Sequence, residues 1–407
     1  MIDTGDTTFI MISAALVMFM VPGLALFYGG MVRRKNVLST IMQSIFTLAV
    51  ISIIWAIFGY TLAFGPDKWH FIGSLKHLGL QGIGQQPGEY AGTIPALTFM
   101  VYQGMFAAIT PALIAGAFAE RMKFKAYLIF VILWSILVYS PIAHWVWGGG
   151  WIGSLGALDF AGGAVVHISS GAAALVGAIV LGKRTGLNGG GWKPHNLTMT
   201  MTGAAILWFG WFGFNAGSAL AANGIAANAF VTTHLAAAAG VVSWVTAEWL
   251  RDGSPTTLGA ASGAIAGLVA ITPAAGFVSP MSAIIIGLLG GAICYYAVGL
   301  KWKFGYDDSL DVVGVHFAGG TVGALATGLF AEKAINASGE NGLFFGNPSL
   351  LGIQFISIVA VVAYSVTISY ILLRLIDKLV GLRVGKAEET RGLDLSEHSE
   401  VGYALMD

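Results

Sequence analysis

Long apolar stretches recur from one end of the chain to the other. Each is near the roughly 20 residues that an α-helix needs to cross the hydrocarbon core of a membrane. Of the 407 residues, 56% are hydrophobic and 10% are charged, a balance that a water-soluble protein of this size does not need. The sequence therefore predicts an all-α integral membrane protein with eleven transmembrane helices, at 8–30, 38–64, 95–118, 126–146, 162–181, 197–220, 228–250, 258–276, 281–300, 312–331 and 351–375.

The lysines and arginines fall almost entirely in one set of alternate loops and in the C-terminal region. That set holds 17 of the 20 positive residues, and the other loops hold only Lys68, Lys76 and Lys333. Positive residues concentrate in short cytoplasmic loops of membrane proteins. We therefore expect a multi-pass protein of the plasma (inner) membrane, with the N-terminus outside and the C-terminus in the cytoplasm.

No soluble domain stands out between the apolar stretches. Residues 1–377 are expected to form one membrane domain, and residues 378–407 a cytoplasmic tail. The 57 glycines are too many for turns alone and indicate tight packing between helices. Glu120 and Arg121, at the inner end of the third span, are expected to be interfacial charges. A net charge of zero without a basic stripe gives no support for nucleic-acid binding.

One pattern, Asp-(x7)-His-(x3)-Gly, occurs twice. The fifth and tenth predicted helices carry the copies, and these helices run in opposite directions, as expected for two inverted halves of five helices followed by an eleventh helix. Eight residues advance about 12 Å along a helix, near half of a roughly 30 Å core, so both histidines should reach the same depth. The copies are Asp159, His167, Gly171 and Asp308, His316, Gly320.

An ionisable residue inside a span is costly and usually faces a cavity or a partner. The alternative is that His167 and His316 are unrelated core residues, each satisfied by its own hydrogen bond, but their matched depth and context favour a pair. A neutral pair shares one N–H···N bond and leaves its other ring positions facing a pore, where they can bind a small molecule such as ammonia or relay a proton. Zinc is a further alternative, but the apolar sequence shows no third or fourth ligand beside them.

Aromatic residues cluster near the outer ends of several spans. An interfacial aromatic belt explains many of them without a functional role. A cation between the faces of Phe106 and Trp147 would gain about 1 to 2 kcal/mol when partly desolvated, and Ser218 could accept one of its N–H bonds. Asp159, at the outer start of the fifth helix, is expected to cap backbone N–H groups and to add negative potential near that cation.

Six ordered blocks of residues resemble the ammonium transporter, methylammonium permease and Rhesus (Amt/MEP/Rh) family, in particular its bacterial and archaeal ammonium transporters. The resemblance spans essentially the whole chain and implies a homotrimer of eleven-helix subunits, each with its own pore. The blocks are Pro22-Gly-Leu-Ala-Leu-Phe-Tyr-Gly-Gly30, Trp147-Gly-Gly-Gly150, Leu158 to Gly163 with Val166-His167, Gly210-Trp-Phe-Gly-Phe-Asn-Ala-Gly-Ser218, Ser262 to Leu268 and Gly314-Val-His316.

The resemblance also implies roles for individual residues. The outer ammonium site would be formed by Phe106, Trp147 and Ser218, and the gate beneath it by Phe106 and Phe214. The pore histidines would be His167 and His316, and Asp159 would be a structural or electrostatic carboxylate.

The function implied is ammonium transport without enzymatic activity, cofactor or metal. The chain would capture ammonium at the outer site, deprotonate it and conduct ammonia, with or without the proton. The tail, 378–407, resembles a regulatory segment that couples subunits and meets a PII-type signalling protein. Two alternatives stay open: an ammonium sensor that signals through the tail without flux, and a membrane enzyme that uses His167 and His316 with a metal.

Overall fold

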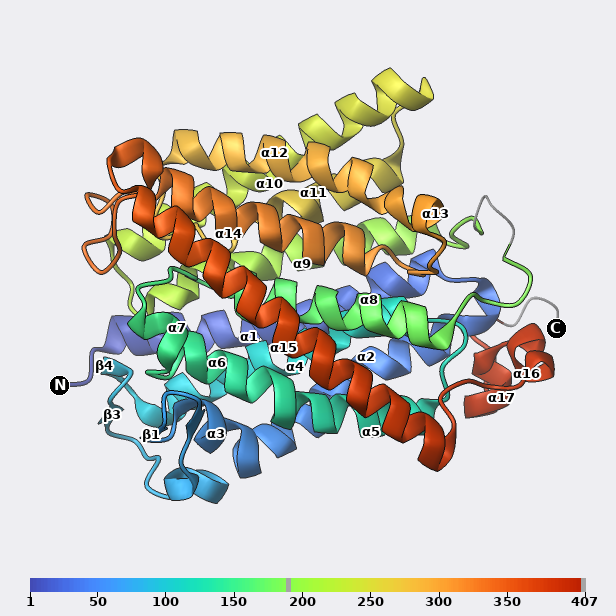
Figure 1. The fold of residues 1–407 in the computed structure, drawn as a ribbon, viewed down its shortest axis with the longest axis horizontal. Coiled ribbons are helices and arrows are strands. Elements are labelled where there is room, and N and C mark those ends of the chain that lie inside the picture. The colour runs from blue at the N-terminus through green and yellow to red at the C-terminus, as the bar shows by residue number, and fades with distance from the viewer. Residues whose placement is uncertain (188–191, 404–407) are drawn as a thin grey trace.

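The computed structural model describes residues 1–187 and 192–403, and they form a bundle of helices whose long axes are roughly aligned (Figure 1). The N-terminus lies at one end of the bundle, and the last two helices, α16 (Lys386–Arg391) and α17 (Leu393–His398), lie at the opposite end. We call these ends the N-terminal face and the C-terminal face. The final residues of the expected tail, 404–407, lie outside the described residues.

Within the described part of the chain, ten helical segments are long and apolar enough to cross a membrane, and α11 is a shorter apolar helix. This confirms the predicted all-α membrane fold. The main helices are α1 (Thr4–Met31), α2 (Val37–Ile54), α3 (Tyr60–Phe64), α4 (Ala96–Phe118), α5 (Phe124–Trp134), α6 (Ser140–Trp147), α7 (Trp151–Ser154), α8 (Ser169–Leu181), α9 (Leu197–Ala216), α10 (Gly224–Asp252), α11 (Thr257–Ile271), α12 (Pro280–Val298), α13 (Leu300–Phe304), α14 (Ala318–Phe330) and α15 (Pro348–Val380).

Several observed ends differ from the expected ones. The helix α11 ends at Ile271 rather than at residue 276, because Pro273 has no N–H to donate to the helical ladder. The last helix, α15, continues to Val380, past the expected end at 375 and slightly past the expected boundary of the tail at 378.

Among the described residues, four π-helical turns interrupt or begin the long helices, and the apolar pattern did not predict them. A π turn inserts a residue into the helical repeat, redirects the side chains on that turn and is frequent at functional sites. Two of the four carry the repeated histidines, so the two copies of the sequence pattern also share a backbone irregularity. The turns are Trp55–Gly59, Ser135–Tyr139, Gly163–Ile168 and Val313–Phe317.

Glycines let neighbouring helices approach more closely than side chains would allow. A Cβ atom at Gly203 of α9 would lie 2.2 Å from the backbone nitrogen of Phe27 of α1. At Gly267 of α11 a Cβ would lie 2.2 Å from the carbonyl oxygen of Ala236 of α10. Both contacts are to backbone, which cannot swing aside, so the expected tight packing between helices is present.

The helix α15 crosses the bundle diagonally and packs on α8 and α14 (Figure 1). Its 33 residues span about 50 Å, longer than a hydrocarbon core of about 30 Å, so it must tilt or extend beyond the core. Two short antiparallel hairpins lie at the N-terminal face, where they precede α4. Their strands are β1 (Asp67–Lys68), β2 (Ile72–Gly73), β3 (Pro87–Gly88) and β4 (Ala91–Pro95).

Candidate functional site

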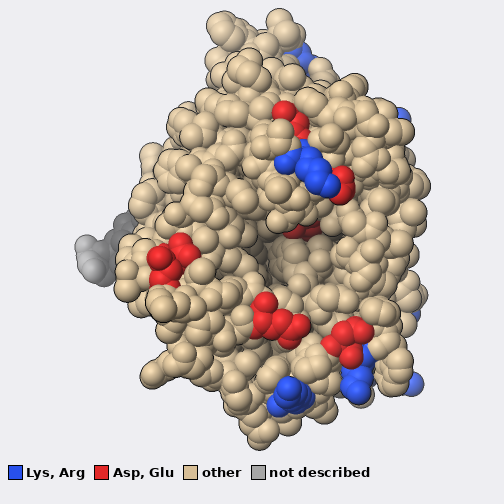
Figure 2. All heavy atoms as spheres, turned by 90° about the vertical axis from the view of Figure 1, so that its left-hand side faces the viewer, with Lys and Arg blue, Asp and Glu red and all other residues tan. Residues whose placement is uncertain are grey.

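A cavity of about 300 Å³, the vestibule, opens at the N-terminal face, which is hollowed near its centre (Figure 2). Three of the residues predicted for an outer ammonium site, Phe106, Trp147 and Ser218, line it together. The indole N–H of Trp147 donates to the carbonyl oxygen of Asp159 at 2.8 Å, which fixes the ring. The Ser218 hydroxyl donates to the carbonyl oxygen of Phe214 at 2.9 Å, and the Tyr102 hydroxyl lies 3.2 Å from Ser218 Oγ. A hydroxyl oxygen has two lone pairs, so Ser218 can still accept one hydrogen bond from a guest.

Two phenylalanine rings close the floor of the vestibule. Phe106 of α4 and Phe214 of α9 stack with ring centroids 4.2 Å apart and an interplanar angle of 25°. Trp147 meets Phe106 edge-on, with centroids 6.1 Å apart and an angle of 90°. The hydroxyl of Tyr102, one turn earlier on α4, lies within hydrogen-bonding distance of the carbonyl oxygens of Gly213 and Phe214, which ties the two helices together at this level. A solute can pass only if the stacked rings move.

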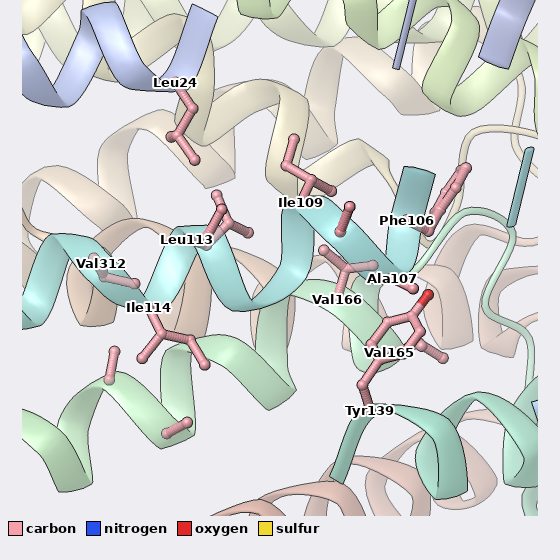
Figure 3. Close-up of a cluster of buried hydrophobic side chains, with 14 of the residues drawn as sticks. Leu24, Phe106, Ala107, Ile109, Leu113, Ile114, Tyr139, Val165, Val166 and Val312 are labelled. Carbon is pink, nitrogen blue, oxygen red and sulfur yellow. The ribbon is translucent and has the colours of Figure 1, made fainter. Parts of the chain in front are cut away.

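Beneath the stacked rings lies a cavity of about 20 Å³, which is enough for about one water molecule. Its lining is apolar apart from the two histidines and the Trp211 N–H. Leu24 of α1 points toward Ile109 and Leu113 of α4, and these three side chains form part of the wall (Figure 3).

The two repeated histidines meet at this cavity. His167 Nδ1 and His316 Nδ1 are 3.2 Å apart, and both rings are buried. This contact needs one ring to donate and the other to accept, so at least one imidazole must be neutral. Among the described residues, His167 Nε2 has no hydrogen-bond partner, and His167 and the Trp211 ring are stacked with centroids 5.5 Å apart. The pair therefore offers unused hydrogen-bonding capacity in an otherwise apolar wall.

Asp159 organises the backbone between the vestibule and the first histidine. Its carboxylate accepts four N–H bonds, from residues 162 to 165, at 2.6 to 3.1 Å. Burial raises the pKa of the Asp159 carboxyl above its ordinary value, while the four amide donors oppose this rise because they favour the ionised form. In the second half of the chain, Asp308 Oδ2 similarly accepts the N–H of Val313 at 2.7 Å. Each carboxylate thus caps the turn that carries a histidine.

The prediction that eight helical residues separate Asp159 from His167 is wrong. The residues directly after Asp159 are not helical, and the π turn begins only at Gly163, so His167 lies four residues into the helix rather than eight. The depth of the two histidines is therefore set by the capped loops and not by helical rise alone.

The glycines of the repeat form the contact between the two histidine segments. A Cβ atom at Gly171 would lie 2.5 Å from the backbone nitrogen of Phe317, the residue after His316. A Cβ at Gly320 would lie 3.0 Å from the Cβ of His167. Each glycine thus makes room for the segment that carries the other histidine.

Replacing Gly171 with alanine should separate the two histidine segments. Overpacking of this kind costs about 1 to 3 kcal/mol, and small displacements at a working site cost about tenfold to hundredfold in rate. We expect ammonium flux in proteoliposomes to fall by at least about tenfold. The matched control is Gly224→Ala, because a Cβ there meets no atom within 4 Å. Equal flux in the two variants would show that the close approach is not needed.

Charged side chains are buried near the C-terminal face. The Arg184 guanidinium lies between two carboxylates, 2.8 Å from Glu120 Oε2 and 2.9 Å from Asp307 Oδ2, and Arg33 Nε is 3.0 Å from Glu120 Oε1. Glu120 is 2% exposed and Arg121 is fully buried, so the expectation of interfacial charges at these two residues is wrong. Burial alone would raise the pKa of the Glu120 carboxyl, but Arg184 and Arg33 outweigh it and hold this pKa below its ordinary value.

A cavity of about 320 Å³ opens beside this network, and Glu120 and Arg184 form part of its wall. The apolar cavity at the histidines is thus flanked by two larger spaces. Met31 of α1 lines the larger cavity, while Leu24 and Phe27, earlier on the same helix, line the small one. On α4, Phe106 lines the vestibule, and Ile109 and Leu113, later on the same helix, line the small cavity. The orders along α4 and α1 together place the three spaces in sequence from the N-terminal to the C-terminal face.

The tail packs against the same C-terminal face. Glu389 accepts the backbone N–H of Thr185 at 2.6 Å and pairs with Arg383 at 2.8 Å. Asp394 accepts the N–H of Ser39, at the start of α2, at 2.8 Å. The tail therefore contacts the start of α2 and the loop that carries Arg184, which lines the cavity of about 320 Å³.

The sequence assigned no role in the site to Trp208, Trp211 or Gln103, and the structure places these residues differently. Trp208 packs with its ring centroid 5.6 Å from that of His234 on α10 and does not line the vestibule. Trp211 stacks on His167 and donates to the Thr272 hydroxyl at 2.9 Å. Gln103 also lines the vestibule and was missed; its place one turn before Phe106 on α4 is the signal that could have found it.

Comparisons with known proteins cover nearly the whole chain. The sequence profile of the Ammonium Transporter Family matches residues 8–403. The chain is 56% identical over 400 residues to an ammonium transporter of Bacillus subtilis (strain 168), covering 98% of each protein. The crystal structure of Saccharomyces cerevisiae Mep2 superposes with a TM-score of 0.89 at 39% identity, over 95% of this chain and 89% of that one. A solved protein described as a sensor Amt protein superposes with a TM-score of 0.90 at 28% identity, over 97% of this chain and 98% of that one.

Proposed function

The chain belongs to the Ammonium Transporter Family, and from this premise we propose how it transports ammonium: it binds the ion at the vestibule, removes its proton and conducts ammonia past His167 and His316. The observation that carries the proposal is the 3.2 Å contact between the two imidazoles in an apolar cavity beneath stacked phenylalanines. The cycle is completed by the departing proton, which either returns outside or follows along the histidines.

Chemistry rather than size must separate ammonium from potassium, because the two ions are similar in size and charge. A potassium ion cannot lose its charge, and an apolar cavity of about 20 Å³ offers it too few oxygen ligands to replace its water. Ammonium can leave its proton behind and enter as a neutral molecule with N–H donors and a lone pair. His167 Nε2, which has no partner among the described residues, can then bond to it.

The vestibule supplies the binding step. In the proposed pose, ammonium lies against Trp147 and the upper face of Phe106, and donates one N–H to Ser218 Oγ. Asp159 holds the Trp147 indole through its carbonyl oxygen and adds its buried negative charge close to the cation. The stacked rings of Phe106 and Phe214 act as the gate, which opens for the smaller neutral molecule.

We further propose that the N-terminal face is extracellular, that the protein lies in the plasma membrane as a homotrimer, and that the tail from residue 378 regulates flux. The distribution of lysine and arginine supports the orientation. The contact of Glu389 with the loop at Thr185 and the contact of Asp394 with the start of α2 support a regulatory role for the tail, where a PII-type signalling protein would bind.

A flux assay separates transport from sensing. The purified full-length chain in proteoliposomes should dissipate an ammonium gradient faster than empty liposomes, measured as current and as lumenal pH, and should leave a potassium gradient intact. A pure sensor, the alternative suggested by the likeness to a sensor Amt protein, would leave both gradients as they are in empty liposomes.

A further inference from the structure

Gln103 is a buried polar side chain that the steps described above do not use. It lies on α4, three residues before Phe106, and its side chain lines the vestibule together with Trp147 and Ser218. The residue is 9% exposed, and its Oε1 has no hydrogen-bond partner among the described residues. Buried polar groups are nearly always paired, so an unpaired carboxamide at the wall of a binding cavity points to a guest that pairs with it.

Most other polar groups at the vestibule already form hydrogen bonds with backbone carbonyl oxygens. The Trp147 N–H is used by the Asp159 carbonyl, and the Ser218 proton is used by the Phe214 carbonyl. The Tyr90 hydroxyl lies 3.3 Å from the carbonyl oxygen of Gly148. The Gln103 carbonyl oxygen, by contrast, is buried and has no partner among the described residues. It can accept two N–H bonds. Because the terminal torsion of a glutamine is broad and roughly two-fold, a half turn of the amide exchanges its two ends and turns this oxygen toward the vestibule.

We propose that Gln103 is a specificity-determining residue, whose carbonyl oxygen accepts an N–H bond from ammonium in the vestibule and disfavours methylated ammonium. This inference rests on the proposed function. Bonds from a charged donor are stronger than neutral ones, so the oxygen binds the cation and not merely a water molecule. Ammonium donates in four tetrahedral directions and can satisfy Gln103 and Ser218 together.

Methylammonium has one donor fewer and a methyl group in its place. When the methyl group faces Gln103, the buried carbonyl oxygen loses its partner; when it faces elsewhere, another vestibule contact is lost. A site built to hydrogen-bond a substrate rejects the analogue that lacks the donor, because its own polar group is left unpaired. Potassium has no such directional requirement, so its exclusion is left to the apolar pore below.

The test replaces Gln103 with methionine, which keeps the length of the side chain and removes the acceptor. In proteoliposomes, the KM for ammonium should rise about tenfold in Gln103→Met, the value of one hydrogen bond, and the KM for methylammonium should rise by less than about threefold. Gln103→Glu retains the acceptor oxygens and should keep the preference for ammonium. Potassium exclusion should persist in both variants.

Each outcome separates this inference from the function on which it rests. If the unmodified chain moves no ammonium, the proposed function fails. If it does, and Gln103→Met changes both KM values equally or neither, Gln103 does not set specificity and only this inference is overturned. Should the methionine variant not fold, Gln103→Leu, which also removes the acceptor, takes its place: a larger rise in the KM for ammonium than in that for methylammonium supports the role, and equal or absent changes contradict it.

Discussion

Replacing Asp159 with asparagine should abolish most ammonium flux and lower the stability of the protein. The carboxylate accepts four backbone N–H bonds, and an asparagine offers a single acceptor oxygen and places an NH₂ group against amides that need acceptors. Leaving buried donors unpaired costs about 1 to 3 kcal/mol for each neutral group, so a total loss near about 3 kcal/mol is expected. The first histidine would then lose the capped turn that positions it.

The control for Asp159 is a carboxylate with a purely local role. Asp3 caps α1 through one hydrogen bond, from the N–H of Asp6 at 2.9 Å, and it is exposed. Asp3→Ala should cost about 1 kcal/mol and leave flux within about twofold of the unmodified chain. Both the ammonium flux and the thermal stability of purified protein should be lower in Asp159→Asn than in Asp3→Ala. If Asp159→Asn matches Asp3→Ala in both measurements, the cap is not essential.

Replacing both His167 and His316 with leucine should reduce ammonium flux by about tenfold to hundredfold. Without His167 and His316, ammonia entering the small cavity would leave its water and find almost no hydrogen-bond partner. Burying such a polar group unpaired costs about 1 to 3 kcal/mol on the scale of protein substitutions, which corresponds to the expected loss in rate. His234→Leu, at an exposed position on α10 away from the cavity, is the matched control.

Much of the fold followed from periodicity and composition, because the membrane restricts a spanning chain to helices whose length is set by the bilayer. The eleven apolar helices and the close packing at glycines such as Gly203 were predictable on this basis. The π turns were not. The π turns depend on how the backbone adjusts when helices pack closely, for example where Gly171 contacts the backbone at Phe317. The apolar pattern of the sequence does not indicate such close contacts.

The candidate site was predictable where residue type and context were both unusual, as for a histidine inside an apolar span. Other residues of the site were not predictable, because they are distinguished only by a hydrogen-bond partner that they lack in the folded structure. The sequence places Gln103 one turn before Phe106 on the same helix, but its burial without a partner at the vestibule is visible only in the structure. Glu120 was misjudged for a related reason, because the arginines that pair with it come from loops far away in the sequence.

The most direct test of this account is the response of reconstituted protein to ammonium and potassium pulses, followed both as current and as lumenal pH. With His167 and His316 intact, or with only His234 replaced, ammonium should produce a response and potassium none. In the double leucine variant, the ammonium response should fall to a tenth or less. A double variant that responds to ammonium as the unmodified chain does, and still excludes potassium, would contradict the central claim that the paired imidazoles carry ammonia through the pore.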